Sequence, residues 1–257
     1  MFSFSLAKFA FFSWFRTKGS IVGPLFFLAL MFVIEGSFWG SVNGGENPLG
    51  PYLPTEVLVY SIAALTIAQM GACSGEPDAL SEKIEMGLLD SQLLRPQYYL
   101  VQMGSIQMGH CFARLITFSP LLIAAHLFLS RPLRVAEIGT LLITVPLAGL
   151  INFLINHGLS SATFYFRESY AFVVAKDTLF WVISGTLVPL DLFPEAFHAV
   201  LPYFPPAYIV FYPVSCFMGR SSFFEVLFFQ VSLCIFLGAL GSRFWKYGVR
   251  RYQAVGG

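Results

Sequence analysis

Three polar residues within one apolar stretch are the first candidates for chemistry. Asn152, Asn156 and His157 stand at offsets of 0, +4 and +5, so in a helix they share roughly one face. Amide and imidazole groups among apolar residues serve either as solute contacts or as hydrogen-bonding groups between helices. We treat this face as a candidate lining of a transport path, with interhelical hydrogen bonding as the alternative. Lys176 and Asp177, in the next apolar stretch, can pair with groups on another helix.

A serine and a histidine raise the question of an intramembrane protease, with Ser184 as nucleophile and His157 as base. The local sequence Val182-Ile183-Ser184-Gly185 lacks the G-x-S-G context, and no loop rich in oxyanion-binding groups is evident. The sequence also contains no GxxxxGK[ST] phosphate loop. We therefore predict that this chain has no catalytic residues and does not hydrolyse ATP itself.

The cysteines and the net charge exclude two further classes. The four cysteines are far apart, without a CxxC or Cys/His spacing, so neither a zinc site nor a disulfide framework is predicted; they are Cys73, Cys111, Cys216 and Cys234. A formal net charge of +1 gives no reason to expect nucleic acid as a partner. We predict no bound metal and no cofactor held by this chain.

Charge is concentrated in one segment, residues 76–99, although only 11% of the chain is charged. Leu80, Ile84 and Leu88 lie at i, i+4 and i+8 and form an apolar stripe of a short helix. The other side of that helix carries Glu82, Lys83 and Glu85. Gly87 is a plausible break, and Leu93-Leu94-Arg95-Pro96 leads out of the segment because proline stops simple helix continuation. An amphipathic helix with charges of both signs suits a surface that docks a protein, and a charged loop lying on lipid headgroups is the alternative.

A second unusual segment runs from Ser184 to Arg220 and is both apolar and rich in proline. Six prolines fall between Pro189 and Pro213, so one straight helix is excluded. Irregular backbone at membrane depth persists only when it is buried in protein or lines a cavity. We predict short broken helices, with residues 191–221 as a re-entrant-like segment. Pro189, Phe193 and Phe197 are candidate gate residues, unless the segment is a static aromatic plug.

The composition of the chain predicts that membrane-spanning helices position these candidate residues. The chain has 257 residues, of which 56% are hydrophobic and 29 are Phe, and its mean hydropathy is +0.71. We predict an all-α integral membrane protein that forms a single transmembrane domain over residues 1–257. Six stretches are long enough to span a bilayer, since about 20 apolar residues suffice; they are Ile21–Trp39, Val57–Gly75, Ile106–Leu129, Val135–Leu159, Tyr170–Leu190 and Phe223–Ser242.

The lysines and arginines set the orientation. With both termini in the cytosol, twelve of the fifteen Lys and Arg residues lie on the inner side and three, Arg131, Arg134 and Arg220, lie on the outer side. Residues 1–20 are too short to span, and their aromatic residues recur near helical spacing beside Lys8, Arg16 and Lys18. We predict a helix lying in the inner membrane interface, and an N-terminal extension of the first span is the alternative.

Several motifs together resemble those of the ABC type-2 transport permeases, the six-helix membrane subunits of bacterial ABC exporters. The matching residues are Lys83 to Gly87, Leu93 to Pro96, Ser184 to Leu190 with Leu192-Phe193-Pro194, Pro213 to Gly219, and the ending YGVRRYQAVGG. No single motif is as diagnostic as a phosphate loop, but their order and spacing follow the family over essentially the whole chain.

The resemblance implies a function that composition does not. Two permeases, identical or related, would enclose the substrate path in a bacterial inner membrane, among membrane lipids, as multi-pass subunits. Two copies of a separate ATP-binding subunit would carry ATP and Mg and dock on the helix between spans two and three, the coupling helix. Leu80, Ile84 and Leu88 would then dock, and Glu82, Lys83 and Glu85 would set the register. Arg95 would anchor the connection Leu93 to Pro96 to lipid headgroups or to a carboxylate. The alternatives are a secondary transporter and a structural membrane subunit.

Overall fold

The computed structural model describes residues 3–42, 50–71, 83, 86, 89, 93, 98–128, 135–165, 170–198 and 200–250. Within these ranges the regular elements are all helices, and none is a strand. The α-helices are α1 (Phe4–Arg16), α2 (Lys18–Val42), α3 (Pro54–Gly71), α6 (Tyr99–Phe128), α7 (Val135–Ser160), α8 (Tyr170–Ile183), α9 (Glu195–His198), α10 (Phe211–Phe217) and α11 (Phe223–Val249). Four short 3₁₀ helices join them: η1 (Ser161–Phe164), η2 (Leu190–Leu192), η3 (Leu201–Tyr203) and η4 (Pro205–Tyr208).

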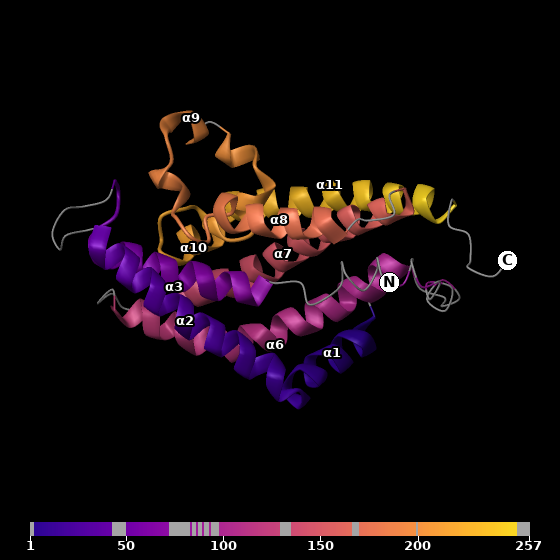
Figure 1. The fold of residues 1–257 in the computed structure, drawn as a ribbon, viewed down its shortest axis with the longest axis horizontal. Coiled ribbons are helices and arrows are strands. Elements are labelled where there is room, and N and C mark those ends of the chain that lie inside the picture. The colour runs from indigo at the N-terminus through magenta and orange to yellow at the C-terminus, as the bar shows by residue number, and fades with distance from the viewer. Residues whose placement is uncertain are drawn as a thin grey trace.

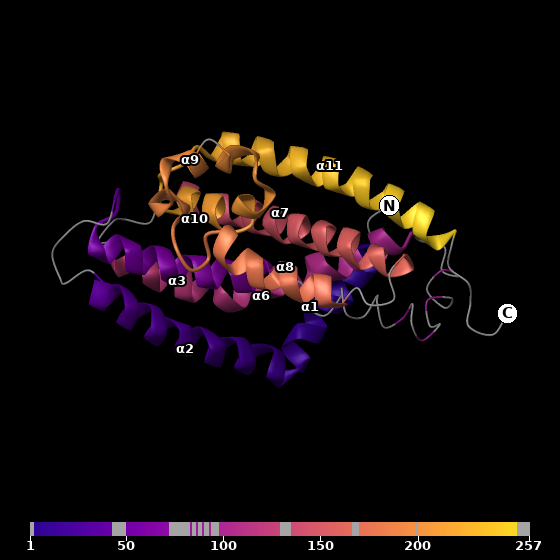
Figure 2. The same ribbon diagram turned by 45° about the horizontal axis from the view of Figure 1, so that its top comes forward.

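The long helices lie side by side along the longest axis of the molecule (Figure 1). Figure 2 shows α11 at one edge, α7 beside it, α3 and α6 next, and α2 at the other edge. Helix α7 packs against α3, α6, α10 and α11 and is therefore the centre of the bundle. The start of α1 and the end of α11 lie at one end of the bundle, and α9 and α10 lie at the opposite end (Figure 1).

Among the residues that the structure describes, four helices are long and apolar enough to cross a membrane: α2, α6, α7 and α11. The all-helical membrane fold predicted from sequence is confirmed at this level. For the other two predicted spans the described residues form a helix of 18 residues, α3, and one of 14 residues, α8. At about 1.5 Å per residue, α8 is roughly 21 Å long, against a hydrocarbon core of about 30 Å. The prediction that the chain crosses the membrane six times therefore stays a prediction.

Helix α8 ends earlier than the sequence predicted, at Ile183 and not at Leu190. Gly185 has a φ of +80°, a left-handed conformation that a continuing helix cannot contain. The Tyr60 hydroxyl donates to the Gly185 carbonyl at 2.7 Å, and the amide of Phe211 donates to the Ser184 carbonyl at 3.0 Å. The turn after α8 is therefore fixed by α3 and α10, and its backbone groups are satisfied by those neighbours.

The N-terminal segment forms a helix of its own. Thr17, between α1 and α2, is extended, with φ −98° and ψ 101°, so the alternative of one continuous helix is wrong. Helix α1 packs on α6, where the backbone of Ala7 approaches Gly109 so closely that a Cβ there would clash with the Ala7 carbonyl oxygen. The indole of Trp14 donates to Thr117 Oγ1 at 3.2 Å. The position of α1 in the membrane interface stays a prediction.

Candidate functional site

The predicted docking segment falls largely outside the described residues. This applies to Leu80, Glu82, Ile84, Glu85, Leu88 and Arg95. Lys83 is described, and its ammonium lies 5.9 Å from the centre of the Tyr99 ring. Leu89 is fully buried, and its amide donates to the Lys83 carbonyl at 3.2 Å. The described part of the segment thus turns back onto the start of α6.

Leu89 packs on a group of stacked rings that we call the inner aromatic cluster: Tyr99, Phe153, His157, Phe164 and Trp245. The Tyr99 and Trp245 rings are nearly parallel, 7° apart, with centroids separated by 4.7 Å. The His157 ring lies 5.3 Å from that of Trp245. The cluster therefore joins α6, α7, η1 and α11 at the end of the bundle where α11 terminates.

Sequence reasoning missed this cluster because its rings come from four separate segments. The one available signal was the pair of aromatic residues near the ends of long apolar stretches, Tyr99 at the start of α6 and Trp245 near the end of α11. His157, predicted to share a path-lining face with the two asparagines, has 1% of its surface exposed and lies within the cluster. The structure thus separates His157 from Asn152 and Asn156.

The two asparagines meet a lysine from another helix. Lys176 on α8 donates to Asn156 Oδ1 at 2.6 Å and lies 3.5 Å from Asn152 Oδ1. Asn152 also donates to the carbonyl of Gly71, at the end of α3, at 3.3 Å. Lys176 is 8% exposed and forms an ion pair with Asp177, whose side chain is 57% exposed. Asn152 and Asn156 are therefore engaged between helices in this structure, and a role in a path stays a prediction.

The proline-rich segment is broken into short helices, as predicted: η2, α9, η3, η4 and α10. Exposure rises along its first part, which therefore runs from the core to the surface. Pro189 is buried, Phe193 is half-buried and Phe197 is 55% exposed. The rings of Phe193 and Phe197 touch edge to face at 5.8 Å. Its last part, α10, is buried against α3 and α7. The structure brings the three candidate gate residues into one segment, and gating by them stays a prediction.

Gln230 on α11, which is fully buried, fixes the middle of this segment. Its amide nitrogen donates to the carbonyl of Tyr208 at 3.0 Å and to that of Thr144 on α7 at 3.1 Å. One side chain thus satisfies backbone groups of both η4 and α7, which matters because a buried carbonyl without a partner is costly.

The segment before α3 is tied to the proline-rich segment by side chains that we call the outer clasp: Tyr52, Glu56, Asp191 and Arg220. The Tyr52 hydroxyl donates to Asp191 Oδ2 at 2.8 Å. Arg220 donates to Glu56 Oε2 at 2.9 Å and to the Pro51 carbonyl at 3.1 Å, and its guanidinium lies 4.0 Å from the centre of the Tyr52 ring. Burial, followed by the negative charge of Asp191, raises the pKa of Tyr52 above its ordinary value, so its hydroxyl keeps its proton.

A comparison of the chain with models of protein families identifies the family to which it belongs. Residues 46–256 match the model of the ABC-2 family transporter protein. The chain belongs to the ABC-2 transporter family. The resemblance drawn from sequence is thereby confirmed, and the chain is a membrane component of ABC transport, a component that is generally non-catalytic. No curated protein and no solved structure matched the chain in the same comparisons.

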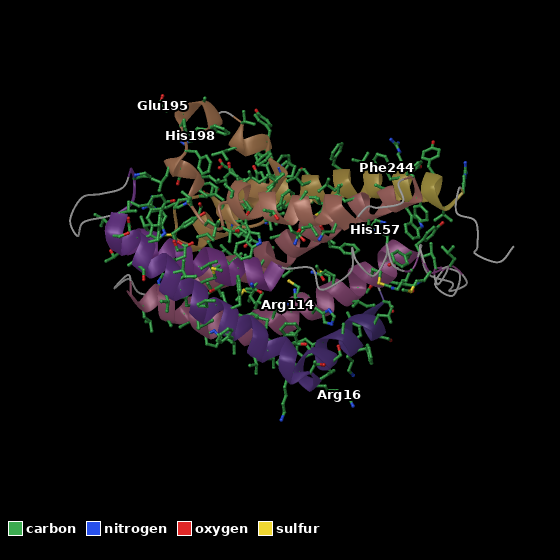
Figure 3. The ribbon with its side chains drawn as sticks, viewed as in Figure 1. Arg16, Arg114, His157, Glu195, His198 and Phe244 are labelled. Carbon is green, nitrogen blue, oxygen red and sulfur yellow. The ribbon has the colours of Figure 1, made fainter. Side chains whose placement is uncertain are left out.

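In this ABC-2 permease the candidate residues divide between two ends. Figure 3 shows His157 and Phe244 toward the end where α11 terminates, and Glu195 and His198 at the opposite end. The inner aromatic cluster and the outer clasp therefore lie at opposite ends of the bundle. Lys176, with the two asparagines, lies between α7 and α8.

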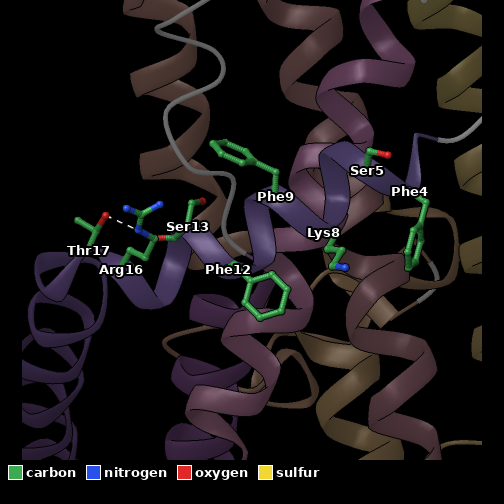
Figure 4. A pocket seen from close by; sticks show the side chains of 8 residues that line it. All are labelled: Phe4, Ser5, Lys8, Phe9, Phe12, Ser13, Arg16 and Thr17. Carbon is green, nitrogen blue, oxygen red and sulfur yellow. Dashed lines mark hydrogen bonds between the residues drawn. The ribbon is translucent and has the colours of Figure 1, made fainter.

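The exposed side of α1 is also suited to a boundary between water and lipid. Phe4, Phe9 and Phe12 are between 55% and 75% exposed. Figure 4 shows them on the surface of α1 with Lys8 and Arg16, around a groove of about 690 Å³. Exposed rings beside basic groups are typical of helices that lie along a membrane surface.

Proposed function

We propose that this permease is the membrane subunit of an ATP-driven exporter, working with a second permease that is identical or related. Two copies of a separate ATP-binding subunit would dock on residues 76–99 and bind ATP and Mg. Helices α3 and α8 would complete six spans in a bacterial inner membrane, with both termini in the cytosol. The family match is the basis of the transport assignment, and the remaining statements go beyond it.

The observation that carries the coupling proposal is the burial of Leu89 on the inner aromatic cluster. Tyr99 begins α6, and Trp245 lies near the end of α11. A displacement of the 83–93 segment would therefore press directly on two long helices, and through His157 on α7. Packed interiors respond to such displacements by moving as units, because they resist compression.

The mechanism then follows from linkage. ATP would favour the closed pair of ATP-binding subunits, and docking would convert that closure into a displacement of residues 76–99. The permease would alternate between two packings with different affinities for the substrate. In the packing described here the outer clasp is formed, so opening toward the outer side would separate Tyr52 from Asp191 and Arg220 from Glu56.

The test is replacement of Ile84 by Glu in the complex with its ATP-binding subunit. A carboxylate on the apolar stripe should abolish co-purification of that subunit, because burying an unpaired charge in an interface is costly. Val200→Glu makes a similar change at a 57% exposed residue of the proline-rich segment and should leave co-purification intact. Equal co-purification by the wild type and Ile84→Glu would refute the docking assignment.

One observation favours a second candidate, a secondary transporter. Lys176 is a buried charge inside the bundle, and transporters driven by ion gradients use such groups. The two functions differ in what purified permease does alone in vesicles. Transport driven by an ion gradient without an ATP-binding subunit supports the second candidate, and transport that requires that subunit and ATP supports the first.

A further inference from the structure

Beside the outer clasp lies an open groove of about 700 Å³, a volume within the range of sites for drug-sized ligands. Its lining combines aromatic rings with polar groups and includes Asp191, His198, Phe211, Tyr212, Ser215 and Arg220. The residues come from η2, α9, α10 and the turn after α10. The groove is therefore built where the proline-rich segment folds back on itself.

Ser215 is one of the lining residues and is 2% exposed, and its buried hydroxyl oxygen makes no hydrogen bond among the described residues. A buried hydroxyl without a partner costs free energy.

The charges of the groove favour a cation. Arg220 is held by Glu56 and by the Pro51 carbonyl. In contrast, no basic group of the described residues lies within ion-pair distance of Asp191, which accepts a hydrogen bond from the neutral hydroxyl of Tyr52. Among the lining residues, Asp191 and Arg220 carry formal charges when histidine is counted as neutral, and the charge of Arg220 is paired with Glu56, which does not line the groove. A positive ligand group would therefore be attracted to Asp191.

The aromatic lining suits the same ligand. The rings of Phe211 and Tyr212 meet edge to face at 5.1 Å, and Tyr212 stacks on Tyr208 at 4.4 Å. Aromatic faces attract cations through the ring quadrupole and bury apolar ligand groups. From the groove, the uncompensated carboxylate and these rings, we infer that the permease binds organic cations with an aromatic or apolar body at this outer site. This inference rests on the proposed function, since it names a class of substrate for it.

The experiment measures binding of tetraphenylphosphonium to the full-length permease in phosphatidylcholine nanodiscs by equilibrium dialysis, with empty nanodiscs subtracted. Asp191→Asn removes the charge and keeps an oxygen that accepts from Tyr52. We expect saturable binding that this variant weakens roughly tenfold, because a charge pair at a partly desolvated surface loses its Coulomb attraction.

Two controls make the result specific. Glu195 is an acid of the same segment that points away from the body of the molecule (Figure 3) and does not line the groove; Glu195→Gln should change binding less than about twofold. Triphenylphosphine oxide, an uncharged analogue, should bind equally to the wild type and to Asp191→Asn. Absent saturable binding, or an Asp191→Asn variant that binds the cation like the wild type, would overturn the inference. If Asp191→Asn weakened binding of the uncharged analogue as much as binding of the cation, the inference would also fail, because the loss would then come from a folding defect and not from the charge.

The proposed function is tested separately, because no ATP-binding subunit takes part in this measurement. If the cation does not bind while the ATP-binding subunit still co-purifies and drives transport, the substrate class is wrong and the exporter stands. If the cation binds and no ATP-binding subunit associates, the site stands and the exporter does not.

Discussion

Replacement of Lys176 by Met tests what the polar residues of α7 do. The methionine keeps the apolar stem and removes the ammonium that donates to Asn156. Asn156 is 3% exposed, so its side-chain oxygen would be left without this donor in a site that water does not reach. Asp177 would also lose its ion-pair partner, at little cost because its side chain is 57% exposed.

The expected loss follows from the geometry. A hydrogen bond from a charged group contributes about 1.5–3 kcal/mol in a soluble protein. Within a bilayer the average is lower, about 0.6 kcal/mol, since the unfolded chain in the membrane also finds partners. The short 2.6 Å contact with Asn156 is the dominant interaction, and the 3.5 Å contact with Asn152 is weaker. We therefore expect Lys176→Met to lower the free energy of unfolding by about 1–2 kcal/mol.

The assay is a double-mutant cycle with Asn156→Leu, read by unfolding in mixed micelles with increasing sodium dodecyl sulfate. Because two apolar groups of matching shape replace a hydrogen-bonded pair at little cost, the double variant should recover at least half of the loss. Thr178→Val is the control on the same helix. Its hydroxyl is exposed and donates to the Val174 carbonyl one turn earlier in the same helix, so this variant should stay within about 0.5 kcal/mol of the wild type.

Activity then separates the two interpretations of this cluster. If the lysine and the asparagines only join α7 to α8, the double variant should regain ATP hydrolysis by the assembled complex together with its stability. If they line the path, hydrolysis coupled to transport should stay impaired in a double variant that is stable. Additive losses in the cycle, or a Lys176→Met variant as stable as the wild type, would refute the energetic reasoning itself.

Two further predictions address the turn after α8 and the topology. Gly185→Ala should destabilise the permease by more than about 2 kcal/mol, because it adds a Cβ 2.8 Å from the Tyr60 hydroxyl to the strain of a positive φ. Gly219→Ala, at φ +71° with open space around it, should cost about 1 kcal/mol in the same unfolding assay, and equal losses would show that crowding at Gly185 is unimportant. A cysteine in place of Phe197 should react with an impermeant thiol reagent added to intact cells, whereas Met86→Cys should react only after permeabilisation. The reverse pattern would invert the orientation.

Much of the fold is local in origin and was accessible from the sequence. The apolar stretches that become α2, α6, α7 and α11 are recognisable because hydropathy and length act within one segment. The breaks in the proline-rich segment are equally local, since each proline removes a backbone donor where it stands. The end of α8 was misplaced because Ser184 to Leu190 is apolar, whereas the helix is stopped by the left-handed Gly185 held against Tyr60.

The contacts that define the candidate sites are not local. Tyr52 meets Asp191 across 139 positions of the chain, and Lys176 meets Asn156 across two helices. Which side chains meet depends on the rotation and register of packed helices, and these follow from packing and not from the composition of either segment. The sequence by itself therefore determined a membrane permease with one charged and one proline-broken segment. Only the tertiary structure decided that His157 belongs to an aromatic cluster, that Lys176 engages the asparagines, and that Asp191 lines a groove of the proline-rich segment.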